Sequence, residues 1–546
     1  MKPFALFSLS AVLLGACSSA RPEVVPAPLP DSIVEAATPD REAPPNWHLL
    51  DFATDGVAGI SVLRAERELL AGRQPARTVV VAVIDGGVDT AHVDLRTNLW
   101  RNPDERPGNR VDDDGNGYVD DVYGWNFIGG ADGRPVRYDT FEISRLYRRC
   151  EGARPMGAAD TLPTAIRGQC REIVELFQEK RTEAERTLAN IRGIDAALSP
   201  ALPLLRLAAG TDSLTPANVR AINSTDRNVQ RARQLFLQLA ADGITPAIIA
   251  DAKEAYESQV RYGYDPTYEP RPTIGDDYLD LSERIYGNRD VTGPDADHGT
   301  HVAGIIGAAR NEQGIDGVAT AVQIMAIRAV PDGDERDKDV ANAIRYAVDN
   351  GAQIINMSFG KAYSPYKPAV DAAVRYADER GVLMVHAAGN DAADIAKTTS
   401  FPTPVYADGG RAQNWIEVGA SSWRGLDSLA APFSNYGQAQ VDVFAPGVDI
   451  RSTLPGDRYD VNSGTSMAAP VVTGLAAMLM AYYPDLTAQD VKRIILESAT
   501  RYTTQNVVRP GTSTGESVVF GTLSTTGGIV NAYSAIRLAE AQASRQ

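Results

Sequence analysis

The sequence is poor in three features that would assign it to a class of protein directly. It has 3 cysteines in 546 residues, too few for the disulfide framework of a small secreted domain. Its 53 basic residues are outnumbered by 70 acidic ones, which gives a net charge of −17 at pH 7. A nucleic-acid binder needs a basic face, so we expect no nucleic-acid partner. No apolar run approaches the roughly 18 residues of a membrane-spanning helix.

The rest of the composition is that of a folded protein. Hydrophobic residues make up 44% of the chain and charged residues 23%, which argues against disorder throughout. The length allows roughly two to four domains with well-buried cores.

The N-terminus carries an export signal. Lys2 precedes an apolar run from Phe4 to Leu14, too short to span a bilayer but typical of a signal-peptide core. The ending Leu14-Gly15-Ala16-Cys17 resembles the bacterial lipobox, which implies cleavage before Cys17 and lipid on that cysteine. We therefore expect residues 1–16 to be a lipoprotein signal peptide. The protein would be an exported envelope lipoprotein, held in the outer membrane through Cys17 on its periplasmic or external face. The alternative is an ordinary secretory signal with an incidental cysteine.

Composition divides the mature chain into four segments. Prolines crowd the first, which predicts an extended tether, and the third is rich in Arg, Glu, Ala, Leu and Gln, which predicts a helical insertion. The second and fourth together form one α/β domain. The segments are 17–45, 46–138, 139–262 and 263–546.

The insertion has clear helix signals. Residues 171–197 and 216–241 read as helices, the second with Thr215 as its N-cap, and Thr245-Pro246 opens a third. We expect a hairpin or small bundle and assign no chemistry to it. Cys150 and Cys170 are compatible with a disulfide in an exported protein, and equally with two small buried side chains.

The flanking segments alternate strands with helices. The apolar run 78–84 predicts a buried central strand that ends at the turn Asp85-Gly86-Gly87. Such alternation predicts a parallel sheet with helices on both faces, and ligands bind such sheets beyond the carboxyl ends of the strands. The further predicted strands are 323–330, 353–357 and 382–388, and the predicted helices are 339–349, 368–379 and 531–543.

Three motifs bring together the groups needed for acyl transfer. Val83-Ile84-Asp85-Gly86-Gly87 places a carboxylate at the end of a buried strand. Asp297-His298-Gly299-Thr300-His301 places an imidazole at the start of a helix of small residues. Ser463-Gly464-Thr465-Ser466-Met467-Ala468 places a hydroxyl at a helix N-terminus, where free amides and the helix dipole favour a developing anion. A nucleophile, a general base and an orienting acid are thus present.

These motifs resemble those of the subtilisin-like serine proteases, the subtilases. The order Asp…His…Ser is that of the family, whereas α/β-hydrolases run Ser…acid…His with a G-x-S-x-G elbow. Gly464-Thr465-Ser466-Met467-Ala468 has no second glycine, which counts against a lipase or esterase. The resemblance implies an α/β fold with a doubly wound parallel sheet and a serine endopeptidase with protein or peptide substrates. No cofactor is expected for catalysis.

The resemblance also implies a role for each catalytic residue. Ser466 would attack the scissile carbonyl, His298 would take its proton and return it to the leaving amine, and Asp85 would orient the imidazole. Asn390, in Ala387-Ala388-Gly389-Asn390, matches the residue that binds the oxyanion. The segment Asn356–Gly360 resembles the strand that lines the S1 pocket, along which substrate pairs. The substrate-binding residues implied are Ser358, Phe359, Gly360, Ala388 and Gly389.

Two neighbouring histidines carry separate expectations. His301 is expected to pack structurally, as the second histidine of the motif does in this family. His386 stands where the family usually has a small apolar residue, so it is either a satisfied buried histidine or a group that tunes the S1 wall.

Two sets of residues are candidate calcium ligands. Asp112, Asp114, Asn116 and Asp120 have the spacing of a calcium loop, although Tyr123 stands where an EF-hand has its glutamate. Asp121 or a distant carboxylate would close the loop, and the alternative is a solvated acidic turn. By resemblance alone, Asp94 and Asn311 match positions of a family calcium site.

Acidic residues cluster after the predicted strand 323–330, in a segment that by resemblance flanks the S2–S4 subsites. We hypothesise that they favour basic or polar side chains upstream of the cut, the alternative being a solvated loop. They are Asp332, Asp334, Glu335, Asp337 and Asp339.

The chain departs from the compact family members in the 213 residues that separate Asp85 from His298. The insertion accounts for this distance and could act as a lid, a substrate platform or a partner site. Two other functions remain open: a catalytically silent binding protein on a subtilase scaffold, and an esterase or acyltransferase with the same triad. The sequence does not specify an oligomeric state.

Overall fold

The computed structural model describes residues 42–151, 164–241, 243–512 and 515–544. The expected signal peptide, Cys17 and the tether up to residue 41 lie outside these ranges. Within them, the main sheet has nine strands in the order β10-β13-β7-β6-β5-β4-β1-β3-β2, parallel throughout except for the β10–β13 pair. The strands are β1 Val79–Asp85, β2 Gly124–Asn126, β3 Val322–Arg328, β4 Ile354–Met357, β5 Leu383–Ala387, β6 Trp415–Ser421, β7 Val443–Pro446, β10 Thr500–Arg501 and β13 Gly528–Ile529.

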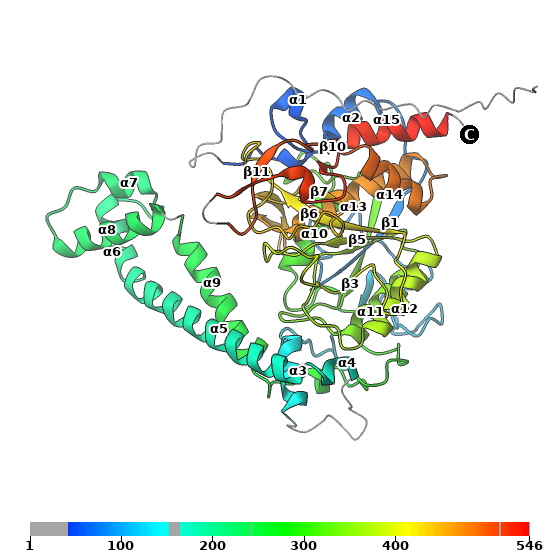
Figure 1. The fold of residues 1–546 in the computed structure, drawn as a ribbon, viewed down its shortest axis with the longest axis horizontal. Helices are drawn as coiled ribbons and strands as arrows, with labels where there is room; N and C mark the ends of the chain where they lie inside the picture. Colours follow the sequence, from blue (N-terminus) through cyan, green and yellow to red (C-terminus); the bar gives the residue numbers. More distant parts are fainter. Residues whose placement is uncertain (1–41, 152–163, 242, 513–514, 545–546) are drawn as a thin grey trace, which may run out of the picture.

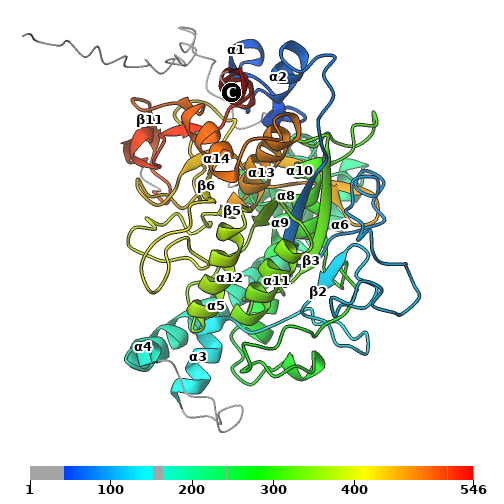
Figure 2. The same cartoon turned by 90° about the vertical axis from the view of Figure 1, so that its right-hand side faces the viewer.

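Helices cover both faces of this sheet, as predicted (Figure 2). Successive side chains of a strand point to opposite faces, so β1 sends Val81 and Val83 into one hydrophobic cluster and Ala82 and Ile84 into another. The first cluster includes side chains of α10 and α13, and the second those of α11 and α12. The bounds are α10 Asp297–Gly307, α11 Asp337–Asp349, α12 Lys367–Glu379 and α13 Thr465–Tyr482.

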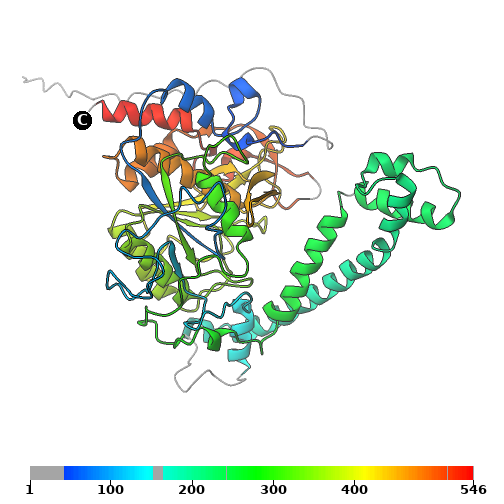
Figure 3. The same cartoon turned by 180° about the vertical axis from the view of Figure 1, so that it is seen from behind.

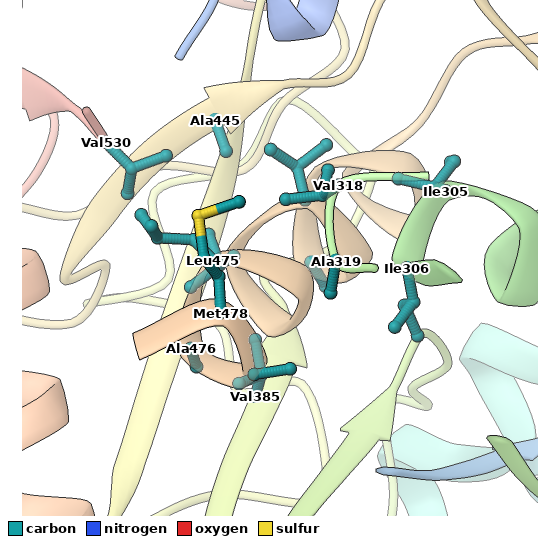
Figure 4. Packing of buried hydrophobic residues seen from close by; sticks show 14 of the residues in the cluster. Ile305, Ile306, Val318, Ala319, Val385, Ala445, Leu475, Ala476, Met478 and Val530 are labelled. Carbon is teal, nitrogen blue, oxygen red and sulfur yellow. The ribbon is translucent and has the colours of Figure 1, made fainter. Parts of the chain in front are cut away.

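Helix α13 is the centre of the first cluster. Leu475 and Met478 of α13 lie in one cluster with Val385 of β5, Ala445 of β7 and Ile305 of α10 (Figure 4). The helix is long and apolar enough to cross a membrane, but 89% of it is buried inside the fold. It is therefore a core helix, and its burial holds its N-terminal turn, which carries Ser466, against the end of the sheet.

Smaller elements complete the α/β core, by which we mean the described residues 42–138 and 264–544. The helices α2 and α15 pack against each other at one end of the sheet (Figures 1 and 2). The remaining helices of the core are α1 Phe52–Asp55, α2 Val62–Glu68, α14 Ala488–Glu497, α15 Ala532–Ala543 and the 3-10 turns Trp47–Leu49, Arg271–Thr273 and Phe520–Thr522; the remaining strands are β8 Ile450–Leu454, β9 Arg458–Asn462, β11 Asn506–Val508 and β12 Ser517–Val519.

The insertion forms a helical arm that projects from the core (Figures 1 and 3). The long helix α5 runs out, α9 returns beside it, and α6, α7 and α8 form the tip around a small apolar cluster. At the base, α3 packs on α5. The elements are α3 Glu142–Cys150, α4 Thr164–Arg167, α5 Cys170–Leu198, α6 Ala201–Ala209, α7 Pro216–Ala221, α8 Arg227–Ala241, α9 Pro246–Ser258 and the π-turn Gln259–Gly263.

The single helix predicted over 216–241 was wrong. The structure has two helices there: α7 ends at Ala221, where Ile222 turns to extended backbone, and Asp226 accepts a hydrogen bond from the Asn228 amide at the start of α8. Thr215 does cap α7, accepting from the Asn218 amide, and Thr245 caps α9 in the same way. The question about the two cysteines is resolved, since Cys150 at the end of α3 and Cys170 at the start of α5 form a disulfide.

Candidate active site

The three predicted catalytic residues come from three different elements that meet at one edge of the sheet, where β1 ends and the helices α10 and α13 begin. Asp85 is the last residue of β1, His298 lies in the first turn of α10, and Ser466 lies in the first turn of α13. β1 and β4 are neighbours in the sheet, but the chain leaves β1 toward β2, beyond β3, and leaves β4 toward β5 on the opposite side. Parallel sheets commonly bind their ligands at such a switch point.

Asp85 and His298 form a close pair. His298 Nδ1 lies 2.8 Å from Asp85 Oδ1 and 3.0 Å from Oδ2, and the Gly86 amide donates to Oδ1 at 2.7 Å. A carboxylate can only accept, so Nδ1 carries the proton and Nε2 faces outward as the base. A side chain at Gly299 would collide with the Gly87 carbonyl oxygen, which is why a glycine follows the histidine.

The surroundings raise the pKa of His298. Desolvation lowers it, but the charge of Asp85, the hydrogen bond to Asp85 and the more distant charge of Asp295 outweigh that effect. The Asp85 side chain is only 4% exposed, so its charge is poorly screened, whereas the His298 side chain is 46% exposed and open to reactants.

We expect activity to fall as the pH drops through this raised pKa, because a general base must be neutral to accept a proton. The rising limb of the pH profile of kcat/KM should have its midpoint above the ordinary histidine value of about 6.5. Asp85→Asn removes the charge and the acceptor, so the midpoint should move to lower pH and kcat should fall about 10⁴-fold. A midpoint that stays in place in the Asn variant would contradict this account of the pair.

Ser466 contacts the segment that directly follows β4. Its Oγ donates to the Ser358 carbonyl oxygen at 3.1 Å, and Ser358 Oγ donates to the Ser466 carbonyl oxygen at 2.9 Å. Across the described ranges, Ser466 Oγ makes no hydrogen bond to His298. Catalytic hydrogen bonds often form or tighten only when substrate is present, so this geometry leaves the predicted pair available.

Asn390 directs an amide toward the same place. Its Oδ1 accepts from the Thr465 amide at 2.8 Å and from Thr465 Oγ1 at 2.9 Å, and this pairing assigns the orientation of the side chain. A Cβ atom on Gly464 would lie 3.4 Å from Asn390 Nδ2 and 3.6 Å from the Ser466 amide nitrogen. Two nitrogens that carry protons thus lie near one point beside the serine, as an oxyanion hole requires.

Gly464→Ala should therefore disable the site without unfolding the protein. The added methyl group would occupy the point that the two donors share, and Gly464 has extended backbone that alanine adopts easily. We expect kcat to fall about 10²-fold or more, the size of the loss of one oxyanion donor. Steady-state kinetics and a thermal melt would check this. Gly193→Ala in α5, where a Cβ would meet nothing within 4 Å and the backbone is helical, is a control for the methyl group alone.

Comparison with known proteins agrees with this geometry. The subtilase family profile matches residues 76–515. The chain belongs to the subtilase family. A thermophilic serine proteinase from Bacillus sp. (strain AK1) is 43% identical over 215 residues, 38% of this chain and 50% of that protein. Subtilisin BL from Lederbergia lenta is 36% identical over 216 residues, 39% of this chain and 74% of that protein.

The chain spans about half the length of some of the curated relatives it matches. Among solved structures, a cold adapted subtilisin-like serine proteinase is 29% identical, with 46% of this chain and 79% of that chain covered and a TM-score of 0.34.

Two of the five predicted substrate-binding residues, Ser358 and Gly389, make hydrogen bonds to Ser466 or to its neighbour Thr465. Ser358 contacts it directly, as described above, and the Gly389 amide donates to the neighbouring Thr465 Oγ1 at 3.1 Å. A Cβ on Gly360 would lie 2.7 Å from Ser400 Oγ. Phe359 is half-buried and Ala388 is buried beside the Asn390 loop.

His386 is a buried histidine whose two ring nitrogens both have hydrogen-bond partners. One of these partners is Phe359, in the segment after β4 that is predicted to bind substrate. Its Nδ1 lies 2.8 Å from Glu417 Oε1, and its Nε2 lies 2.9 Å from the Phe359 carbonyl oxygen. Because both partners are acceptors, both ring nitrogens carry protons. Desolvation lowers the pKa of His386, but the Glu417 carboxylate and the hydrogen bonds raise it overall. His301 packs in the interior, with Nε2 near the Asp460 carbonyl oxygen.

The hypothesis that the acidic run selects basic substrate side chains was wrong. Three of these side chains, Glu335, Asp337 and Asp339, are buried, and two of the three pair with cations brought from elsewhere in the chain. Asp337 pairs with Lys361 at 2.8 Å, Asp339 accepts both terminal nitrogens of Arg271, and Asp334 accepts from the Glu142 amide. Asp332 accepts from Ser258 Oγ. The run therefore anchors the base of the arm to the core instead of presenting charge to a substrate.

The acidic loop gathers carboxylates, but not the set predicted. Asp120 turns away to accept from the Gly108 and Arg110 amides and to pair with Arg289, and both Asp112 oxygens accept from backbone amides of the loop itself. The carboxylates that converge are Glu105, Asp114 and Asp121, whose oxygens all lie within 4.8 Å of one another. Glu105 was missed because it precedes the motif.

The converging set fits a cation. Asn116 and Asn102 both donate to Asp114 and Asp121, so their amides bridge the carboxylates. Glu105 is 6% exposed, and its Oε2 is buried with no hydrogen-bond partner. Burial and repulsion from the neighbouring carboxylates raise the pKa of Glu105. A hard cation with oxygen ligands would satisfy the orphaned oxygen and the excess charge.

The second predicted pair also meets, but its carboxylate is already satisfied. Asn311 Nδ2 donates to Asp94 Oδ1 at 2.9 Å and Tyr459 OH donates to Oδ2 at 2.7 Å. Both oxygens of the buried Asp94 thus accept hydrogen bonds, as both oxygens of Asp121 do in the first set.

Proposed function

We propose that this subtilase is a serine endopeptidase that hydrolyses peptide bonds in proteins. The observation that carries the proposal is the convergence of groups at one edge of the sheet. The Asn390 side-chain amide and the Ser466 amide nitrogen lie near one point beside Ser466, and the Asp85–His298 pair lies at the same edge. Membership of the family supports the same reaction.

The geometry supplies each step of acyl transfer. Ser466 Oγ would attack the scissile carbonyl carbon as its proton passes to His298 Nε2, and the two amides would bind the resulting oxyanion. His298 would then return the proton to the leaving amine, and water would repeat the sequence to release the acid. Asp85 would hold the imidazole in the Nδ1–H tautomer throughout and stabilise the imidazolium.

Two assays on the full chain separate this proposal from its alternatives. A fluorophosphonate probe should label the wild type, since labelling needs an activated serine, and a silent binding protein would stay unlabelled. Casein and a short amino-acid ester should both be cleaved, with turnover of casein the deciding result. Ester cleavage without any proteolysis would indicate an esterase or acyltransferase instead.

We further propose that the acidic loop holds a structural calcium ion. Glu105, Asp114 and Asp121 would supply carboxylate oxygens, and the ion would contribute stability and no chemistry at Ser466.

Calcium should therefore raise the free energy of unfolding. A ligand that binds only the folded state stabilises it by about 2.7 kcal/mol at 100 times its Kd. Thermal unfolding in calcium and in a chelator would measure this difference. Glu105→Gln should abolish most of it, whereas Asp113→Asn should not, because Asp113 faces the Arg106 amide and Asn109 outside the cluster. An equal calcium response in both variants would exclude the site.

The localisation remains a proposal based on the N-terminal sequence. We propose that the protein is a lipid-anchored envelope protein, since the run from Phe4 to Leu14 and the ending Leu14-Gly15-Ala16-Cys17 agree with each other. Metabolic labelling with an alkyne fatty acid in the producing bacterium should mark the wild type and not Cys17→Ser. Release of unlabelled wild type would indicate an ordinary secretory signal.

A further inference from the structure

The tip of the helical arm folds around an apolar cluster of its own (Figures 1 and 3). By the arm tip we mean α6, α7, α8 and the first turn of α9, the described residues 201–241 and 243–249. In the described structure, the main contacts of α6, α7 and α8 are with one another and with α5. The tip therefore adds nothing to the packing around Ser466, and its surface calls for a separate explanation.

The arm tip carries more apolar side chains than its own cluster buries. Leu204 and Leu207 on α6 are 39% and 84% exposed, and Ile248 at the start of α9 is 50% exposed. Three leucines of α8 are only half-buried, and because successive helical residues are about 100° apart, alternate ones point to opposite sides of the helix. They are Leu235, Leu237 and Leu239. The tip thus presents apolar surface on more than one side.

The same segment is basic in an acidic protein. Residues 201–249 contain five arginines, three aspartates and no lysine or glutamate, a net charge of +2 in a chain of −17. None of the five arginines makes an ion pair with a described carboxylate, although Arg206 and Arg233 donate to backbone carbonyl oxygens. Along α5, by contrast, Lys180 and Arg181 pair with Glu183 and Glu185. The tip arginines are Arg206, Arg220, Arg227, Arg231 and Arg233.

Exposed leucines beside unpaired arginines suit the surface of a lipid bilayer. By length and hydropathy, α8 and the segment Pro246–Gly263 together qualify as a bent membrane segment. With 15 and 13 residues, however, α8 and α9 are each too short to span the roughly 30 Å hydrocarbon core, so they fit its surface instead. A bilayer accepts apolar side chains on several sides of a projecting tip, whereas a protein partner needs one contiguous complementary face.

We propose that the arm tip binds the surface of an anionic lipid bilayer. The arginines pair with lipid phosphates, while Leu204, Leu207 and Ile248 enter the boundary between the head groups and the acyl chains. This inference goes beyond the proposed endopeptidase function, and it does not depend on lipid at Cys17.

Such a contact sets the orientation of the catalytic core relative to the membrane. The disulfide between Cys150 and Cys170 joins α3 to α5, and Lys361 of the core lies 2.9 Å from Glu142 of α3, both side chains being buried. The base of the arm is thus fixed to the core, so a tip bound to a bilayer holds Ser466 in a defined place above it. The expected tether 17–45 limits the distance from the membrane but not the orientation.

The test is sedimentation of residues 18–546 with lipid vesicles. This chain contains every described residue and lacks only the expected signal peptide and Cys17, so no lipid anchor contributes. It should bind vesicles of phosphatidylglycerol and phosphatidylcholine at least about 10-fold more tightly than vesicles of phosphatidylcholine alone. Because salt screens exposed charges, binding should weaken between about 0.1 and 1 M salt.

Variants of two arginines test the role of the charge. Arg227→Gln combined with Arg231→Gln should weaken binding to the anionic vesicles by about 10- to 30-fold, since each arginine near such a surface adds to the attraction. Arg375→Gln combined with Arg424→Gln is the matched control. These two arginines lie on the core, are 42% and 56% exposed, and their replacement should leave binding unchanged.

A fluorescent label tests whether the leucines enter the bilayer. In residues 18–546, Cys150 and Cys170 form the disulfide, so Leu207→Cys supplies the sole free thiol for an environment-sensitive dye. Its emission should move to shorter wavelength on anionic vesicles and be quenched by spin-labelled lipid. The same dye at Val508→Cys, a position 39% exposed on β11 of the core, should show neither change.

Three results would overturn the proposal: no binding of the wild type to anionic vesicles, equal losses in the two pairs of arginine variants, or a dye at Leu207→Cys that does not respond. Binding to polyglutamate without binding to vesicles would also overturn it and would assign the tip to an acidic protein partner. Vesicle binding needs no turnover, so labelling of the same samples by the fluorophosphonate probe tests the endopeptidase function separately.

Discussion

Ser466→Ala is expected to lower kcat about 10⁶-fold and to abolish labelling by the fluorophosphonate probe. The size is that of nucleophile loss in subtilisin, a member of the family to which this chain belongs. Ser466 supplies the attacking oxygen from the first turn of α13, and its own amide nitrogen and Asn390 Nδ2 lie near one point beside it. Stopped-flow and steady-state kinetics with a peptide substrate would measure the loss in kcat.

Ser463→Ala is the matched control for that variant. Ser463 lies three residues earlier, is exposed, and accepts a hydrogen bond from the Asp449 amide instead of facing the shared point. It should keep its label and most of its turnover. Residual labelling of the Ser466→Ala protein at wild-type strength would show that another serine is the nucleophile.

Lys361→Met is expected to destabilise the protein by about 3–5 kcal/mol at neutral pH. The ammonium lies between Glu142 and Asp337, whose side chains are 3% and 2% exposed, so its removal leaves the buried Asp337 without a counter-charge and Glu142 with Arg145 alone. Desolvation raises the pKa of Glu142, but the charges of Arg145 and Lys361 bring it down to about 2, so Glu142 is ionised at neutral pH. Denaturant unfolding followed by circular dichroism would measure the loss.

The sign of the pH dependence separates charge from packing. In the variant Glu142 loses one of the two cations that lower its pKa, so that pKa rises and its protonation removes unfavourable charge as the pH falls; the deficit should shrink toward acid pH. Lys397→Met changes the same atoms at a position 80% exposed, paired with Asp394, and should cost less than about 0.5 kcal/mol. A deficit that stays constant with pH would mean that the packing of the lysine stem matters more than its charge.

The sequence by itself was sufficient for the parts of this protein that local chemistry decides. The end of a buried strand at Asp85, the small-residue helix after His298 and the helix start at Ser466 each follow from a few consecutive residues. A parallel sheet brings such ends to one edge, so three separate motifs predicted one site. Thr215 was recognised as a cap, and Thr245-Pro246 as a helix start, for the same reason, since a helix start depends on residues within one turn.

Only the tertiary structure decided which distant groups meet. The acidic run after β3 looked like a solvated surface because its partners, Lys361 and Arg271, are remote in the chain and became neighbours only through folding. Glu105 joins the acidic loop from outside the motif, while Arg289 draws Asp120 away from it.

The pairing of Cys150 with Cys170 belongs to the same class. Spacing along a sequence encodes the geometry of one turn or one strand, but not which buried charge, thiol or apolar surface a long insertion will bring into contact with the core.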